Sequence, residues 1–164
     1  MKPETMTAIA STVIAAAALI VAFWSEHLTR KHNELSVEPI LKITFANHPE
    51  EEYSGFLVSN VGLGPAKITS LSVSVDNQLM PDLGYSGVKT ALSNLKIDRD
   101  WVTITKLNSE TVIPAGKTVP LISVSRKNYE DHINSILGIK KRVGLKLMYE
   151  SMYHVKASVA YGPK

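Results

Sequence analysis

The chain has 164 residues, of which 45% are hydrophobic and 20% charged, and its formal net charge is +3 at pH 7. This length is enough for one domain and a short additional segment, and the composition excludes a chain that is mainly disordered. The sequence has no cysteine, which excludes disulfides, thiolate catalysis and cysteine-ligated metals. It also lacks the dense basic face with interleaved aromatic residues that nucleic-acid binders carry, so we expect no nucleic-acid partner.

Residues 5–25 are predicted to form a transmembrane helix, because the sequence carries no charge between Glu4 and Glu26. A helix of this length spans about 30 Å, the thickness of the hydrocarbon core of a bilayer. Phe23 and Trp24 close the run, and aromatic residues gather at membrane interfaces. The alternative is a cleaved signal peptide, which has a basic n-region, a shorter apolar core and a small-residue cleavage site. Only one lysine precedes this run, which favours an uncleaved anchor.

Small residues repeat at a spacing of four along this helix, at Ala8, Thr12 and Ala16. Such a face lets two helices approach closely in lipid, which predicts a homo-oligomer formed through the anchor. The alternative is that alanine is simply common in weakly apolar anchors.

Basic side chains on the two flanks of the helix predict its orientation. Lys2 stands before the helix, whereas Arg30 and Lys31 follow it. Because cytoplasmic flanks carry the excess of lysine and arginine, we expect the domain on the cytoplasmic side of the membrane.

Residues 26–35 are polar, contain no proline or glycine, and are predicted to continue the helix as a juxtamembrane stalk. A domain over residues 36–164 follows, in which short runs rich in β-branched and aromatic residues are separated by turn signals. Two short helices are expected, one over residues 86–97 and one over residues 128–138 that ends at Gly138. Together these elements predict a mainly-β domain, an antiparallel Ig-like β-sandwich with two short helices, behind an N-terminal transmembrane helix.

A glycine-rich turn over residues 62–65 raises the question of phosphate binding. A P-loop or a dinucleotide-binding loop would need a further glycine at position 67 and a helix after it. Lys67 stands there, and a β pattern follows. The turn is therefore predicted to be structural, with an asparagine and two glycines that tolerate positive φ angles and a proline that favours extended geometry before it. Its residues are Asn60, Gly62, Gly64 and Pro65.

The strand expected after this turn, residues 66–77, alternates strictly between apolar and polar positions. Because side chains of a strand point alternately to its two faces, Leu71, Val73 and Val75 should be buried. The opposite face, which includes Ile68, should be solvated.

The motif NVGLGPA, residues 60–66, resembles the N-x-G-x-G-P-A turn of Ig-like β-sandwich domains in uncharacterised bacterial membrane-anchored proteins. Residues 30–43, which follow the anchor, and the turn over residues 112–117 look like the corresponding parts of those proteins. The resemblance covers the anchor, the junction and the domain. It implies this architecture in a bacterial inner membrane, and it implies no activity.

Four basic side chains near the C-terminus form a candidate patch for an anionic membrane surface or a protein partner. They are Lys140, Lys141, Arg142 and Lys146. The alternative is an edge strand on which lysines prevent aggregation. Tyr149, Tyr153 and Tyr161 are expected near the last hairpin, either as a recognition patch or as cross-strand packing residues.

No pair of histidines has the spacing of metal ligands on a helix, so we expect no metal site and no cofactor. We interpret the chain as a non-catalytic, single-pass membrane-anchored adaptor, an accessory subunit that recognises a protein partner at the inner membrane. One alternative is an envelope protein whose periplasmic domain binds a wall or surface component. Another is a small hydrolase with an unrecognised site.

Overall fold

The computed structural model describes residues 3–47, 53–98 and 100–162. The chain divides into two compact units, Met1–Ser36 and Val37–Lys164. The first unit contains α1 (Pro3–Ser36), one continuous helix that includes the predicted stalk. The segment Met6–Ser36 is long and apolar enough to cross a membrane, a property that signal sequences share. Its large apolar side chains are exposed, for example Trp24 at 67%.

The second unit is built from two antiparallel sheets. The first sheet has the order β1-β2-β7-β5, with β1 (Leu41–Ala46), β2 (Tyr53–Asn60), β7 (Thr118–Ser125) and β5 (Val102–Ile104). The second has the order β4-β3-β8-β9, with β6 also paired to β3. Its strands are β4 (Gln78–Leu83), β3 (Ala66–Val75), β8 (Val143–Glu150), β9 (Lys156–Tyr161) and β6 (Val112–Ile113).

One hydrophobic core fills the space between the sheets. Phe56 of β2, Val73 of β3 and Leu147 of β8 are fully buried in it. Leu92 of α2 (Gly84–Asn94) and Ile136 of α3 (Tyr129–Arg142) add the buried faces of two helices. A short 3-10 turn, η1 (Arg126–Asn128), precedes α3. The prediction of a mainly-β domain with two short helices behind a long apolar helix is confirmed, and the Ig-like variety of the sandwich stays a prediction.

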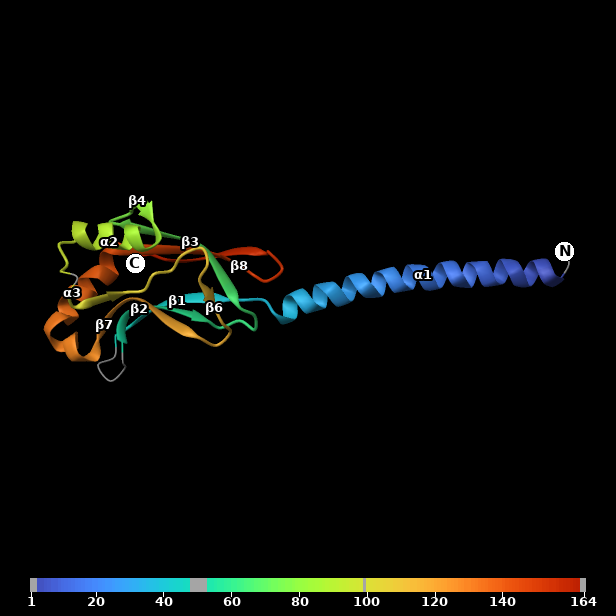
Figure 1. Ribbon diagram of the computed structural model, residues 1–164, viewed down its shortest axis with the longest axis horizontal. Helices are drawn as coiled ribbons and strands as arrows, with labels where there is room; N and C mark the ends of the chain where they lie inside the picture. The colour runs from blue at the N-terminus through green and yellow to red at the C-terminus, as the bar shows by residue number, and fades with distance from the viewer. Residues whose placement is uncertain (1–2, 48–52, 99, 163–164) are drawn as a thin grey trace. The chain divides into compact units, whose positions relative to one another are not determined.

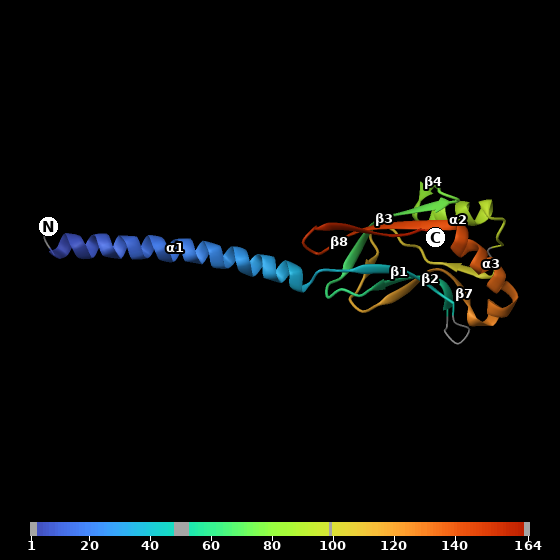
Figure 2. The ribbon, with the colours of Figure 1, turned by 180° about the vertical axis from the view of Figure 1, so that it is seen from behind.

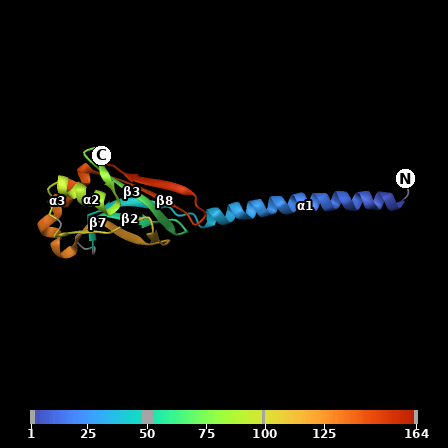
Figure 3. The ribbon, with the colours of Figure 1, turned by 45° about the horizontal axis from the view of Figure 1, so that its top comes forward.

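Strand register defines two ends of the domain. The end at which Val37 arrives, here the junction end, holds the turns over residues 61–65, 113–117 and 151–155, because Leu41 pairs with Asn60 and Lys67 pairs with Glu150. The opposite end, here the distal end, holds α3, which connects the end of β7 to the start of β8. Figures 1 and 2 show the strands of the domain running between these ends, and α3 covers the distal end in the tilted view of Figure 3 as well.

One predicted strand face is wrong at a single residue. Leu71, Val73 and Val75 are buried as expected, but Ile68 is buried as well. The register of β3 against β8 shifts between Ile68 and Ser70. This bulge inserts one extra residue into the strand and reverses the alternation that the sequence pattern assumes.

The predicted end of the second helix is also wrong. The helix does not stop at Gly138 but continues to Arg142, and the extended residue Val143 ends it. A Cβ added at Gly138 would meet nothing within 4 Å, so glycine serves no steric need there. As a result Lys140, Lys141 and Arg142 lie on the last turn of α3. The edge-strand interpretation of Lys146 is wrong too, since β8 lies between β3 and β9.

Candidate functional site

The junction end is organised around Asn60, which is 1% exposed. Its side-chain nitrogen donates hydrogen bonds to the carbonyl oxygens of Gly64 at 2.8 Å and Ile113 at 2.9 Å. Its side-chain oxygen accepts from the backbone N–H groups of Gly62 at 3.1 Å and Ile40 at 3.3 Å. The backbone of Asn60 also exchanges hydrogen bonds with residues 116 and 117, each at 2.9 Å. One buried side chain therefore joins the segment before β1, the glycine turn and the end of β6.

The glycines of the turn are required by close backbone approach. A Cβ on Gly62 would overlap the backbone of residues 38–40, and a Cβ on Gly64 would overlap the carbonyl oxygen of Val37. The tolerance of these residues for positive φ angles is not used, because Asn60, Gly62 and Gly64 all lie outside the left-handed region. Sequence reasoning found the right residues, but the neighbouring backbone that excludes a side chain could not be seen in the sequence.

The amide groups of the turn are already in use. The Val61 N–H donates to the carbonyl of Ile40 at 2.8 Å, and the Leu63 N–H donates to the carbonyl of Glu38 at 3.0 Å. The Gly62 N–H goes to Asn60, as described above. A phosphate-binding loop needs convergent amides that point at the ligand. The N–H groups of this turn instead donate to acceptors within the domain, as in a structural turn between two strands.

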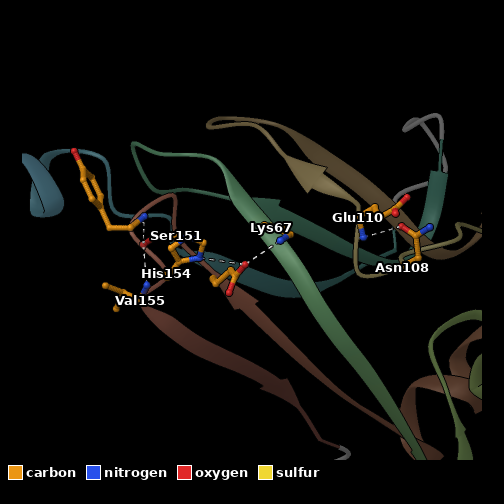
Figure 4. A network of polar contacts seen from close by, with 8 residues as sticks. Lys67, Asn108, Glu110, Ser151, His154 and Val155 are labelled. Carbon is orange, nitrogen blue, oxygen red and sulfur yellow. Dashed lines mark hydrogen bonds and ion pairs between the residues drawn. The ribbon is translucent and has the colours of Figure 1, made fainter.

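A second polar cluster at the junction end surrounds Glu150, whose side chain is 13% exposed. The Lys67 ammonium lies 3.1 Å from its carboxylate and the His154 ring 3.7 Å from it (Figure 4). The hydrogen bond from Lys67 holds the pKa of Glu150 below its ordinary value. In the adjacent turn the Ser151 hydroxyl accepts hydrogen bonds from the N–H groups of Tyr153 and Val155, both at 3.2 Å. This cluster was not predicted, because the sequence does not show which charges face each other across strands.

A groove of about 560 Å³ lies at the distal end, between β1, β9 and α3. It is lined by Phe45, Leu137, Lys140, Lys141, Tyr161 and Gly162. The Lys140 ammonium lies 5.0 Å from the centre of the Phe45 ring, within the range of a cation–π contact. Phe56 packs edge-to-face against both Phe45 and Tyr161, with ring centres 5.1 Å apart in each pair. Burial raises the pKa of the Tyr161 hydroxyl. The groove thus combines an aromatic wall with two cationic groups.

The structure divides the predicted basic patch. Lys140 and Lys141 line the groove together, but Arg142 turns to Asp76, where its Nε donates to the carboxylate at 2.9 Å. Lys146 is exposed on the middle of β8. The predicted membrane-surface or partner patch is therefore reduced to two of its four residues, joined by aromatic residues that the sequence did not indicate.

The three tyrosines do not form one patch. Tyr149 is 6% exposed, and its hydroxyl accepts a hydrogen bond from the Leu41 N–H at 3.4 Å. Tyr161 lines the distal groove, whereas Tyr153 is exposed at the junction end. Tyr149 and Tyr161 therefore fit the packing interpretation.

On α1, the Thr12 hydroxyl donates to the Ala8 carbonyl at 2.9 Å. This bond satisfies the hydroxyl inside the helix and leaves Ala8, Thr12 and Ala16 as a face of small residues, exposed in this chain. Packing of two anchors through this face stays a prediction. Among residues 3–47, 53–98 and 100–162, no group of three histidine, aspartate or glutamate side chains is placed to hold a metal ion.

The pH dependence of stability should report the ion pairs Arg142–Asp76 and Lys67–Glu150. The hydrogen bond from Arg142 lowers the pKa of Asp76 below its ordinary value of 3.8. A carboxyl group with a lowered pKa in the folded state stabilises that state above its ordinary pKa, and this contribution is lost as the pH falls through the lowered value. We expect the double variant Asp76→Asn, Glu150→Gln to show a smaller fall in unfolding temperature between about pH 5 and pH 2. Thermal unfolding of the full chain in detergent measures this. Parallel curves for both proteins would contradict the assignment.

The fold and these contacts define a class: a long apolar N-terminal helix followed by a two-sheet, mainly-β domain. A protein family described as Domain of unknown function (DUF8453) matches residues 6–159, and the chain belongs to this family. The match includes both the helix and the domain, which is consistent with the predicted membership of an uncharacterised family. No curated protein and no solved structure matches the chain.

Proposed function

We propose that the protein is a non-catalytic binding module held at a bacterial inner membrane by α1, with its domain in the cytoplasm. The exposed apolar surface of α1 supports the anchor, since a helix with this surface is stable in lipid and not in water. Arg30 and Lys31 after the apolar run support the cytoplasmic orientation. A tether of this kind raises the local concentration of the domain at the membrane and so strengthens binding to a membrane-associated partner.

The observation that carries the binding role is the distal groove. Its aromatic and aliphatic wall can bury an apolar side chain, and Lys140 and Lys141 can pair with carboxylates. The chemistry fits a protein segment in which an apolar residue is flanked by aspartate or glutamate. The position of the groove, at the end of the domain opposite to Val37, favours a protein partner for these lysines over an anionic lipid surface.

Site-specific photo-crosslinking in cells tests this binding role. A photoreactive residue at Lys141 should capture one defined partner. The same residue at the exposed Lys106, outside the groove, should not. Adding Lys140→Glu to the Lys141 crosslinking variant should remove the crosslink, because the new carboxylate repels an acidic segment. A folded, membrane-bound protein that captures no partner from position 141 would reject the adaptor function.

Protease access in spheroplasts tests the orientation. We expect a C-terminal tag to be protected from added protease until the membrane is permeabilised, because the domain lies in the cytoplasm. A tag that is cleaved in intact spheroplasts would instead place the domain in the periplasm. The envelope-binding alternative would then replace the cytoplasmic one.

A further inference from the structure

Large apolar side chains are exposed at the junction end, on two separate turns and on the short strand β6. Leu63, in the glycine turn, is 74% exposed, and Met152, in the turn between β8 and β9, is 70% exposed. The set comprises Val61, Leu63, Val112, Met152, Tyr153 and Val155. In the described part of the domain, the other exposed large apolar side chains are Ile40, also at this end, and Leu79, Leu83 and Met148 elsewhere. Single exposed apolar residues are ordinary, but a group at one end marks an interaction surface.

The turns that carry these side chains are held firmly. The glycine turn is fixed by Asn60 and by the backbone bonds of Val61 and Leu63. The second turn is fixed by Ser151, whose hydroxyl and carbonyl accept three backbone N–H groups of residues 153–155. Loop mobility therefore does not explain the exposure of these side chains, and the fold presents them outward at a fixed end of the domain.

The short segment that joins the apolar run of α1 to the domain indicates what can contact the exposed apolar side chains of the junction end. Residues 26–36 are all that separate the apolar run from Val37, and as helix they measure about 16 Å. A helix tilted by about 40°, the upper end of the usual range, lowers this height to about 12 Å. The headgroup region fills roughly 5–7 Å of it, which leaves about 5 Å for the turns and their side chains to cross. The bilayer is thus the apolar phase nearest to these turns.

The charges at the junction end indicate that contact with lipid would be made by apolar side chains and not by electrostatic attraction. Lys117 and Lys156 are exposed there, and so are Glu38 and Glu110, so the two signs balance. Lys67 and Glu150 neutralise each other. Attraction to anionic headgroups would need an excess of basic residues. Contact driven by apolar side chains needs none and should persist in neutral lipid and at high salt.

We propose that the turns of the junction end dip into the bilayer that α1 crosses, so that the domain is seated on the lipid and its distal groove faces away from it. This seating rests on the anchor of the proposed function, and it adds a second lipid-binding element to the chain. Separate turns with aliphatic tips and one tyrosine suit the interface of a bilayer, where apolar and polar groups are both accommodated.

The experiment uses the full chain in phosphatidylcholine nanodiscs. Because the sequence has no cysteine, Leu63→Cys, Met152→Cys and the distal control Asn134→Cys can each carry one fluorescent label. We expect lipid with brominated acyl chains to quench the labels at positions 63 and 152 and to leave position 134 unchanged. The quenching should be the same at low and high salt. Adding Tyr153→Glu to Met152→Cys should reduce the quenching, because a carboxylate resists entry into the interface.

Labels at 63 and 152 that stay as unquenched as the label at 134, in chains that co-elute with the discs, would overturn the seating and leave the anchor intact. Labels that are shielded from aqueous iodide but not quenched by lipid would show that a protein covers these turns, which also overturns it. Chains that do not enter the discs would overturn the anchor itself, and the seating with it.

Discussion

Replacing Asn60 with alanine should destabilise the domain by about 3 kcal/mol or more, since each buried polar group left without a partner costs about 1–3 kcal/mol. The substitution leaves two N–H groups and two carbonyl oxygens without their partner, in three segments of the chain. This is a large part of the roughly 5–15 kcal/mol by which domains are stable. Urea unfolding of the full chain in detergent, in a Trp24→Phe background, measures the effect through the fluorescence of Trp101.

The matched control is Asn134→Ala on α3, where the asparagine is exposed. This change should alter the free energy of unfolding by no more than about 0.5 kcal/mol. If Asn60→Ala behaves like Asn134→Ala, the four side-chain hydrogen bonds do not hold the junction end together.

Gly64→Ala is expected to be the next most damaging change. The added Cβ would overlap the Val37 carbonyl oxygen, and a backbone atom cannot rotate away as the end of a side chain can. Overpacking of well-packed sites costs typically about 1–3 kcal/mol, so we expect a loss at or above the upper end of that range. The same fluorescence-detected urea titration applies.

Gly138→Ala is the same chemical change as Gly64→Ala, but we expect it to raise the free energy of unfolding. The position is in the interior of α3 with open space around it, so alanine should stabilise the domain by roughly 0.5–1 kcal/mol. Equal effects of the two substitutions would contradict the close approach at Gly64. They would point instead to a general effect of alanine on the unfolded chain.

The sequence was informative where a local pattern decides the structure. The uncharged run predicted the apolar helix, and the alternation at Leu71, Val73 and Val75 predicted the buried face of β3. Asn60, Gly62, Gly64 and Pro65 predicted a turn. The polar residues 26–35, which lack helix breakers, continue α1 as expected.

Features that depend on distant partners were not predictable from local patterns. The bulge beside Ile68 is set by pairing with β8, and α3 passes Gly138 because its apolar face, with Ile136 and Ile139, remains buried. The distal groove joins Phe45 to Lys140 across most of the domain sequence. No short-range pattern shows this meeting, so the basic patch was assigned with two of its aromatic neighbours missing.

Strand order has a consequence for how the chain is made. β2 pairs with β7 and β3 pairs with β8, so each sheet joins strands from the first and second halves of the domain. Contacts of such long sequence separation form slowly. During synthesis α1 leaves the ribosome before the domain, and β3 then presents an unpaired edge until β8 has been made. The domain therefore completes its fold only after α1 has left the ribosome, and a chain truncated before Val143 would carry an open strand edge prone to aggregation.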